Sequence, residues 1–125
     1  MWSIALPREV EKTLRERIGI PDGVSIEFAY EFEDDISPED SLWDAEVIQW
    51  VTERIEAGND AAWFRCRVSA TDGDAVGEDY LGGCAYEEFA DFLTPDDYFG
   101  DMVASAYDAF MADAARLSLK YAKAL

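Results

Sequence analysis

Residues 24–33 alternate between apolar side chains and polar or small ones, and this alternation is the strongest local pattern in the chain. The apolar positions are Val24, Ile26, Phe28, Tyr30 and Phe32, and the positions between them are Ser25, Glu27, Ala29, Glu31 and Glu33. Successive side chains of a strand point to opposite faces of a sheet, so the period of two predicts a strand with one buried side and one acidic side. The chain is therefore expected to contain a sheet that has one covered face and one face open to solvent.

A second alternation follows over residues 61–70. Its apolar members Phe64, Cys66 and Val68 are expected to point inward, and Trp63, Arg65, Arg67 and Ser69 outward. Asp72-Gly73 is typical of a two-residue hairpin turn. This turn predicts a returning strand over residues 75–81, in which Glu78 lies opposite Arg67.

Helical patterns occupy most of the remaining chain. Residues 7–18 and residues 86–93 predict short helices, and apolar residues spaced three and four apart predict one long helix after Thr94-Pro95. Residues 37–57 predict a further helix, which starts with a capping serine and a proline. The side chains that this helix is expected to bury are Trp43, Val47, Trp50, Val51 and Ile55.

The order of these elements predicts an α+β fold. We expect a small antiparallel sheet of about three strands, with helices packed on one face and a long C-terminal helix. The length fits a single domain that spans residues 1–125.

The charge is strongly unbalanced and excludes several classes of function. The chain has 28 Asp and Glu residues, 10 Lys and Arg residues and no histidine, which gives a formal net charge of −18 at pH 7. Phosphates repel such a chain, so we expect no direct binding of nucleic acid and no attachment to an anionic membrane. Half of the residues are apolar, so the acidity does not imply disorder.

The residue types also argue against catalysis, and we expect that the chain is not an enzyme. Without histidine there is no histidine-based triad and no zinc site with histidine ligands. Paired carboxylates arise by chance among so many acids. Residues 72–77 resemble part of a calcium loop but have Val76 at a ligand position, so we expect no metal and no cofactor.

The two cysteines are too few for a disulfide framework. Cys66 is expected to be a core residue, and Cys84 is expected to be more exposed and well away from it, so we predict no disulfide. The N-terminus has no pattern of a signal peptide, and no apolar run is long enough to span a membrane. We therefore expect a cytoplasmic protein.

Most of the acids fall into two stretches that contain no basic residue. Residues 18–53 hold 11 acids and residues 68–115 hold 12. Carboxylates two residues apart on one face of a strand are roughly 6.6–7 Å apart, close to the spacing of phosphates along a nucleic-acid strand. The first stretch is therefore the predicted partner-binding surface, formed by Glu27, Glu31, Glu33, Asp34, Asp35, Glu39, Asp40 and Asp44. The second supplies a secondary acidic patch, formed by Asp74, Glu78, Asp79, Glu87, Glu88 and Asp91.

The combination of small size, strong acidity, an α+β pattern and no catalytic residues resembles DNA-mimic proteins of phages and mobile elements, which include anti-CRISPR and anti-restriction proteins. Residues 78–89 (EDYLGGCAYEEF) and 97–103 (DYFGDMV) are also similar to segments of small phage proteins. The resemblance implies a non-enzymatic inhibitor, active in the bacterial host cell, that occupies the DNA- or PAM-binding surface of a defence complex such as a CRISPR-Cas effector. Its partner would be a basic nucleic-acid-binding protein, and the chain would be a monomer or a dimer.

Three other interpretations of the acidity stay open. The acids could be a solvated face that keeps the protein soluble, or an adaptation to high salt. The chain could also be an acidic secretion chaperone or an immunity-type protein that binds a basic protein partner without mimicking DNA.

Overall fold

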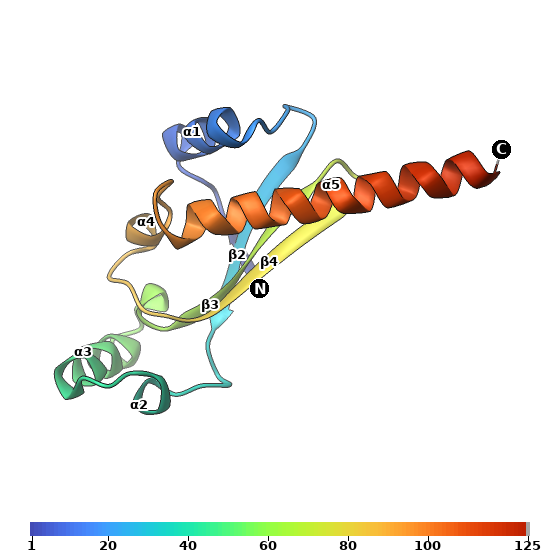
Figure 1. The fold of residues 1–125 in the computed structure, drawn as a ribbon. Coiled ribbons are helices and arrows are strands. Elements are labelled where there is room, and N and C mark those ends of the chain that lie inside the picture. The colour runs from blue at the N-terminus through green and yellow to red at the C-terminus, as the bar shows by residue number, and fades with distance from the viewer. Residues whose placement is uncertain (125) are drawn as a thin grey trace.

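The sheet has four antiparallel strands in the order β1-β2-β3-β4 (Figure 1). The computed structural model describes the backbone of residues 1–124 and the side chains of residues 1–120. The strands are β1 (Trp2–Ile4), β2 (Ser25–Phe32), β3 (Phe64–Thr71) and β4 (Val76–Cys84). The α+β class is confirmed. The sheet has one strand more than expected, because β1 is only three residues long and so shows no periodic pattern of its own.

Five α-helices and one short 3-10 helix accompany the sheet. They are α1 (Arg8–Ile18), α2 (Pro38–Ser41), α3 (Ala45–Glu56), the 3-10 helix η1 (Asp60–Ala62), α4 (Phe89–Phe92) and α5 (Tyr98–Ala124). The long C-terminal helix predicted from the sequence is confirmed as α5, which crosses the sheet and extends past its edge (Figure 1). None of the helices described is long and apolar enough to cross a membrane.

The core lies between the sheet and α5. Phe28 from β2 and Phe64 from β3 pack against Phe92 of α4, and Phe28 also packs against Phe99 of α5. All four rings are almost fully buried. Aromatic pairs of this kind stabilise the core beyond the area they bury, so this ring cluster fixes α4 and the start of α5 against the covered face.

The closest approach of helix and sheet is at Gly77 in β4. A Cβ atom at this position would lie 2.1 Å from the carbonyl oxygen of Ala106 and 2.1 Å from the backbone nitrogen of Phe110. Only a residue without a side chain leaves room for α5 to lie this close to β4.

We predict that Gly77→Ala destabilises the protein by about 3 kcal/mol or more, because the added methyl group forces α5 away from the sheet. Chemical unfolding measures the change. Gly23→Ala is the control, since a Cβ atom there meets nothing within 4 Å and the change should be neutral or slightly stabilising. Equal effects of the two substitutions would contradict the packing described here.

The β3–β4 hairpin is longer than the sequence predicted. Thr71 pairs with Val76, so the loop contains four residues and Arg67 lies opposite Tyr80, while Glu78 lies opposite Ser69. The expected pairing of Arg67 with Glu78 is wrong by two residues.

Side-chain hydrogen bonds explain the longer loop. The Asp72 carboxylate accepts hydrogen bonds from the backbone N–H groups of Asp74 and Ala75, both at 2.9 Å, and the Thr71 hydroxyl donates to the Ala75 carbonyl at 2.6 Å. The two N–H groups lower the pKa of Asp72, since they stabilise its charged form.

This lowered pKa leads to a pH-dependent prediction for Asp72→Asn. A carboxylate whose pKa is lower in the folded state contributes stability above its unfolded pKa of about 3.9, and that stability is lost as the pH falls through the folded value. The variant should therefore be less stable than the native chain at pH 7, and the gap should shrink below about pH 4. Thermal unfolding across this range, with Asp74→Asn as the control, measures the gap. A gap that does not change with pH would be inconsistent with this role.

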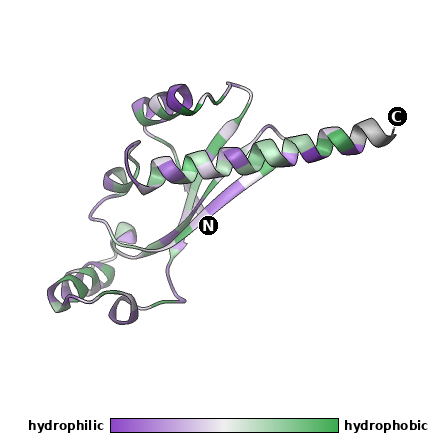
Figure 2. Ribbon diagram, in the orientation of Figure 1, coloured by the Kyte–Doolittle hydropathy of each residue, from purple (hydrophilic) through white to green (hydrophobic). Residues whose placement is uncertain are grey.

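The predicted 37–57 helix is divided into α2 and α3. Asp44 separates them because its carboxylate caps α3, accepting hydrogen bonds from the N–H groups of Glu46 at 2.8 Å and Val47 at 3.3 Å. Trp43 therefore lies in a short connection and is 99% exposed, which is opposite to the burial expected for it. Val51 is fully buried as predicted, whereas Val47 is exposed, and Trp50 and Ile55 are half-buried. Figure 2 shows α3 with alternating hydrophobic and hydrophilic bands.

Trp63 was expected to point outward and is instead buried. It lies between η1 and β3, before the strand alternation begins, and its indole N–H donates a hydrogen bond to the Ile36 carbonyl at 2.9 Å. This bond connects the start of β3 to the segment that follows β2.

Both cysteines are buried and free, which corrects the expectation that Cys84 is more exposed. The register between β3 and β4 shifts between Phe64 and Cys66, so that Phe64 pairs with Cys84 and Cys66 with Leu81, which brings the two cysteines near each other in the core. The expectation that they lie well apart is therefore wrong. The neighbouring Cys84 thiol, together with burial, raises the pKa of the Cys66 thiol, so it stays protonated and unreactive.

Candidate functional site

Two arginines of β3 lie on the open face of the sheet among the acids of β2. Arg65 contacts Glu31 on the neighbouring strand, with Nε 2.7 Å from Oε1. Its Nη1 atom lies 2.7 Å from Asp35 Oδ2 and 3.0 Å from Asp34 Oδ1. Arg67 Nη2 lies 3.2 Å from Glu27 Oε1. The acids that seemed to have no local base are thus paired across strands.

Glu33 occupies a different place from the one predicted. It was expected on the acidic outer side, but it is only 4% exposed. Its Oε1 atom accepts a hydrogen bond from the Gly83 N–H at 3.0 Å, and its Oε2 atom lies 3.5 Å from Arg65 Nη1. The alternation fails here because β2 ends at Phe32 and Glu33 turns toward the end of β4.

Phe32 also departs from its predicted position. It was expected in the core and is 56% exposed. It pairs with Phe64 at the last position of β2, near the sheet edge that β1 only partly extends. Together with Trp2 and Ile55 it lines a shallow hollow at this edge.

The carboxylates of Glu33, Asp34 and Asp35 approach one another closely enough to hold a cation, with oxygens within 4.8 Å. The Arg65 guanidinium already lies among them, at 2.7 to 3.5 Å. The guanidinium occupies the position that a metal ion would need, so Glu33, Asp34, Asp35 and Arg65 form an ion-pair network.

Ten of the acids that are in no ion pair among the described side chains lie around α2, α3, η1 and α4. We call this region the acidic end, and its members are Glu39, Asp40, Asp44, Glu46, Glu53, Glu56, Asp60, Glu87, Glu88 and Asp91. All ten side chains are exposed. Among the described side chains none of them is in an ion pair, and the one basic residue in these elements, Arg54, lies over the Trp50 ring at 4.0 Å.

Two hydrogen bonds, one from a side chain and one within the backbone, hold the acidic end together. The Asn59 side-chain amide donates to the Glu87 carbonyl at 3.0 Å, and the Tyr86 N–H donates to the Ala61 carbonyl at 2.8 Å. They place the segment that leads into α4 beside η1, so acids distant in sequence share one part of the surface.

A row of carboxylates runs along α3 within this region. Glu46, Glu53 and Glu56 are seven and three residues apart, which places them on one side of the helix over a length of about 15 Å. Trp43, almost fully exposed, precedes the helix. The sequence analysis missed Glu53 and Glu56 as contact residues, although their spacing from Glu46 on a predicted helix was the signal that could have found them.

The predicted partner surface is thus divided in two. Glu27, Glu31, Glu33, Asp34 and Asp35 are paired with arginine, and Glu39, Asp40 and Asp44 belong to the acidic end. Asp40 accepts a hydrogen bond from the Ser37 hydroxyl at 2.9 Å.

The residues of the predicted secondary acidic patch also lie in different parts of the structure. Asp74 lies at the hairpin turn, and Glu78 lies on the open face, where it accepts a hydrogen bond from the Tyr80 hydroxyl that raises the pKa of Tyr80. Asp79 pairs with the buried Val68, so it points to the opposite face. The remaining members, Glu87, Glu88 and Asp91, lie at the acidic end, and Glu88 and Asp91 form the capping box of α4.

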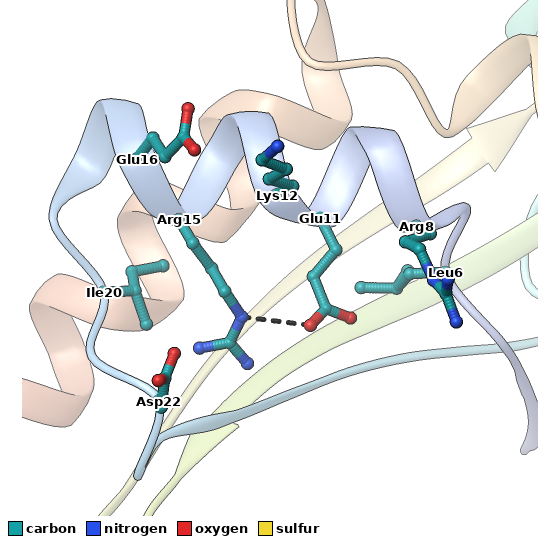
Figure 3. A pocket seen from close by; sticks show the side chains of 8 residues that line it. All are labelled: Leu6, Arg8, Glu11, Lys12, Arg15, Glu16, Ile20 and Asp22. Carbon is teal, nitrogen blue, oxygen red and sulfur yellow. Dashed lines mark hydrogen bonds and ion pairs between the residues drawn. The ribbon is translucent and has the colours of Figure 1, made fainter.

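A pocket that the sequence did not predict lies beside α1 (Figure 3). Its lining includes Arg8, Lys12 and Arg15 together with three acids. Arg15 has a structural role. Its Nε atom lies 3.0 Å from Glu11 Oε2, and its guanidinium donates hydrogen bonds to the carbonyls of Pro21 at 3.0 Å and Val24 at 2.8 Å. These contacts join α1 to the start of β2 and present no set of converging catalytic groups.

Comparison of the chain with protein-family models, with curated proteins and with solved structures finds no match. The functional argument therefore depends on the residues themselves, and above all on the contrast between the paired acids of the sheet and the unpaired acids of the acidic end.

The buried position of Glu33 leads to a stability prediction. Glu33→Ala leaves the Gly83 N–H and one side of Arg65 without their partner, so we expect a loss of about 1–3 kcal/mol in the free energy of unfolding. Glu39→Ala removes the same charge from an exposed position and should change stability by no more than about 0.5 kcal/mol. Denaturant unfolding of both variants checks this. A Glu33→Ala protein as stable as Glu39→Ala would show that Glu33 is an ordinary surface acid.

Proposed function

We propose that the chain is a non-enzymatic inhibitor that mimics DNA and occupies the basic DNA-binding surface of a bacterial defence complex, such as a CRISPR-Cas effector. The observation that carries the proposal is the acidic end, where ten exposed carboxylates lie together without an ion pair among the described side chains. Self-repulsion of such a cluster works against folding, so a gain from binding a basic partner is a physical reason to keep it.

The contact surface that we propose is not the acidic side of β2 that the sequence predicted. Arg65 and Arg67 compensate the acids of β2, so those acids present a weaker field to a partner. We assign the contact to Glu39, Asp40 and Asp44 and to the α3 row of Glu46, Glu53 and Glu56.

Trp43 gives this surface an apolar anchor. A fully exposed tryptophan between acids is the residue type that most often dominates binding energy at protein interfaces. Surrounding carboxylates would meet lysine and arginine side chains that otherwise contact phosphates, which supports competition with DNA at the same groove.

The test is displacement of a labelled DNA duplex from a DNA-binding defence complex, for which an RNA-guided effector is the probe. The native chain should displace the duplex, and the triple variant Glu46→Gln, Glu53→Gln and Glu56→Gln should do so at least about tenfold more weakly, because three charge contacts are lost. Rising salt should also weaken competition by the native chain.

The matched control is the triple variant Glu9→Gln, Glu16→Gln and Asp108→Asn. It changes the net charge by the same amount at exposed positions outside the acidic end. It should compete like the native chain. Equal losses in the two triple variants would assign the effect to total charge and would refute a defined contact surface.

A second candidate, a non-mimetic acidic binding protein such as a secretion chaperone or an immunity-type protein, is favoured by the exposed aromatic side chains. Trp2, Phe32 and Trp43 are each more than half exposed. For such a protein, Trp43→Ala would weaken binding to the basic partner more than neutralising the α3 row, and binding would depend little on salt.

A further inference from the structure

The C-terminal part of α5 extends past the edge of the sheet (Figure 1). Buried positions on α5 end at Phe110, and no described side chain after it, through Lys120, is buried. Met111 and Leu119 are exposed, the latter by 64%. One side of this segment still packs, since Ala114 and Leu117 lie against the core and Asp113 accepts a hydrogen bond from the Val76 N–H at 3.0 Å. The other side of residues 111–120, which we call the overhang, is exposed.

One face of the overhang is both apolar and basic. Ala112, Ala115, Arg116, Leu119 and Lys120 line one shallow hollow, and their spacing of three and four residues places them on a single side of the helix. Arg116 forms an exposed ion pair with Asp113 on the same helix at 2.7 Å, and Lys120 is in no ion pair among the described side chains. In a chain of net charge −18, these two cations are attracted to the acidic surfaces of other copies.

A complementary groove lies at the opposite end of the same helix. It has a volume of about 390 Å³, and its lining includes Leu42, Val47, Leu81, Tyr86 and Tyr98, the first residue of α5. Acids lie next to these lining residues in the sequence: Asp44 near Leu42, Glu87 after Tyr86 and Asp97 before Tyr98. The groove is therefore apolar in its lining and acidic around it.

We propose that the overhang of one copy docks into this groove of a second copy, so that two chains form an antiparallel dimer along α5. Apolar residues such as Leu119 meet Val47 and Tyr98. Arg116 and Lys120 meet Glu87 and Asp97, which are not among the six acids assigned to the contact with a DNA-binding partner. Because the overhang and the groove lie at opposite ends of one helix, a two-fold axis satisfies both at once and closes the assembly at two copies. Antiparallel α5 helices also place their macrodipoles favourably.

The first test measures the mass of the protein in solution at low salt, in the absence of any partner, by light scattering and sedimentation. The native chain should be a dimer at micromolar concentration. Arg116→Glu with Lys120→Glu should weaken the dimer at least about tenfold, because two attractive contacts become repulsive. Circular dichroism shows that the variant is folded.

The matched control is Arg8→Glu with Lys12→Glu, which changes the charge equally at exposed positions on α1. It should leave the dimer intact. A monomeric native chain, a dimer that resists the α5 variant, or equal dissociation by the α1 variant would each overturn the proposal.

A cross-linking experiment tests the docked position directly. A Leu119→Cys chain mixed with a Val47→Cys chain should form an intermolecular disulfide with oxidised glutathione, whereas a mixture of Leu119→Cys and Val76→Cys should not, since Val76 lies at the hairpin, away from the groove. Equal cross-linking in the two mixtures would reject this docking mode. Since no DNA or defence complex is present, failure here leaves the proposed inhibition of DNA binding to its own test.

Discussion

The contacts of Arg65 with the carboxylates of Glu31, Asp34 and Asp35 are the interaction on which the functional part of the structure depends. They hold the segment after β2 against β3, a strand more than 25 residues later in the chain. Glu33 in the same segment binds the Gly83 N–H, and the Ile36 carbonyl accepts from Trp63. Together these contacts fix the point from which α2 and α3 begin, and with it the position of the acidic end.

The excess negative charge thus falls into two regions, the open face of the sheet and the acidic end, which differ in how many of their acids are paired with arginine. On the sheet, two arginines of β3 pair with five acids of β2 and the segment after it, so the charge there is partly compensated and contributes to structure. At the acidic end Arg54, the one basic residue of α2, α3, η1 and α4, lies over the Trp50 ring, so among the described side chains the exposed carboxylates are in no ion pair. Asp44, Glu88 and Asp91 cap helices. A partner with a basic surface would gain its contacts at the second region without having to break those of the first.

Local patterns predicted the parts of the fold whose neighbours are close in sequence. The alternation over residues 24–33 correctly placed β2, and the three-four spacing after residue 97 placed α5. Predictions failed at positions where an element ends: Glu33 follows β2, Trp63 precedes β3, and Trp43 separates two helices. At such positions the periodicity no longer applies, and the orientation of the side chain is set by a tertiary hydrogen bond or a helix cap.

By itself, the sequence determined that a sheet with one covered face exists, that α5 is long and that the chain carries a net charge of −18. These depend on residue type and on spacing over a few positions. Which carboxylates are paired was decided only by the tertiary structure, because Arg65 and Arg67 reach Glu31 and Glu27 across strands that lie 34 and 40 residues apart in the chain. Ion pairs form between neighbours in space, and sequence distance therefore gave no measure of which acids are free to bind a partner.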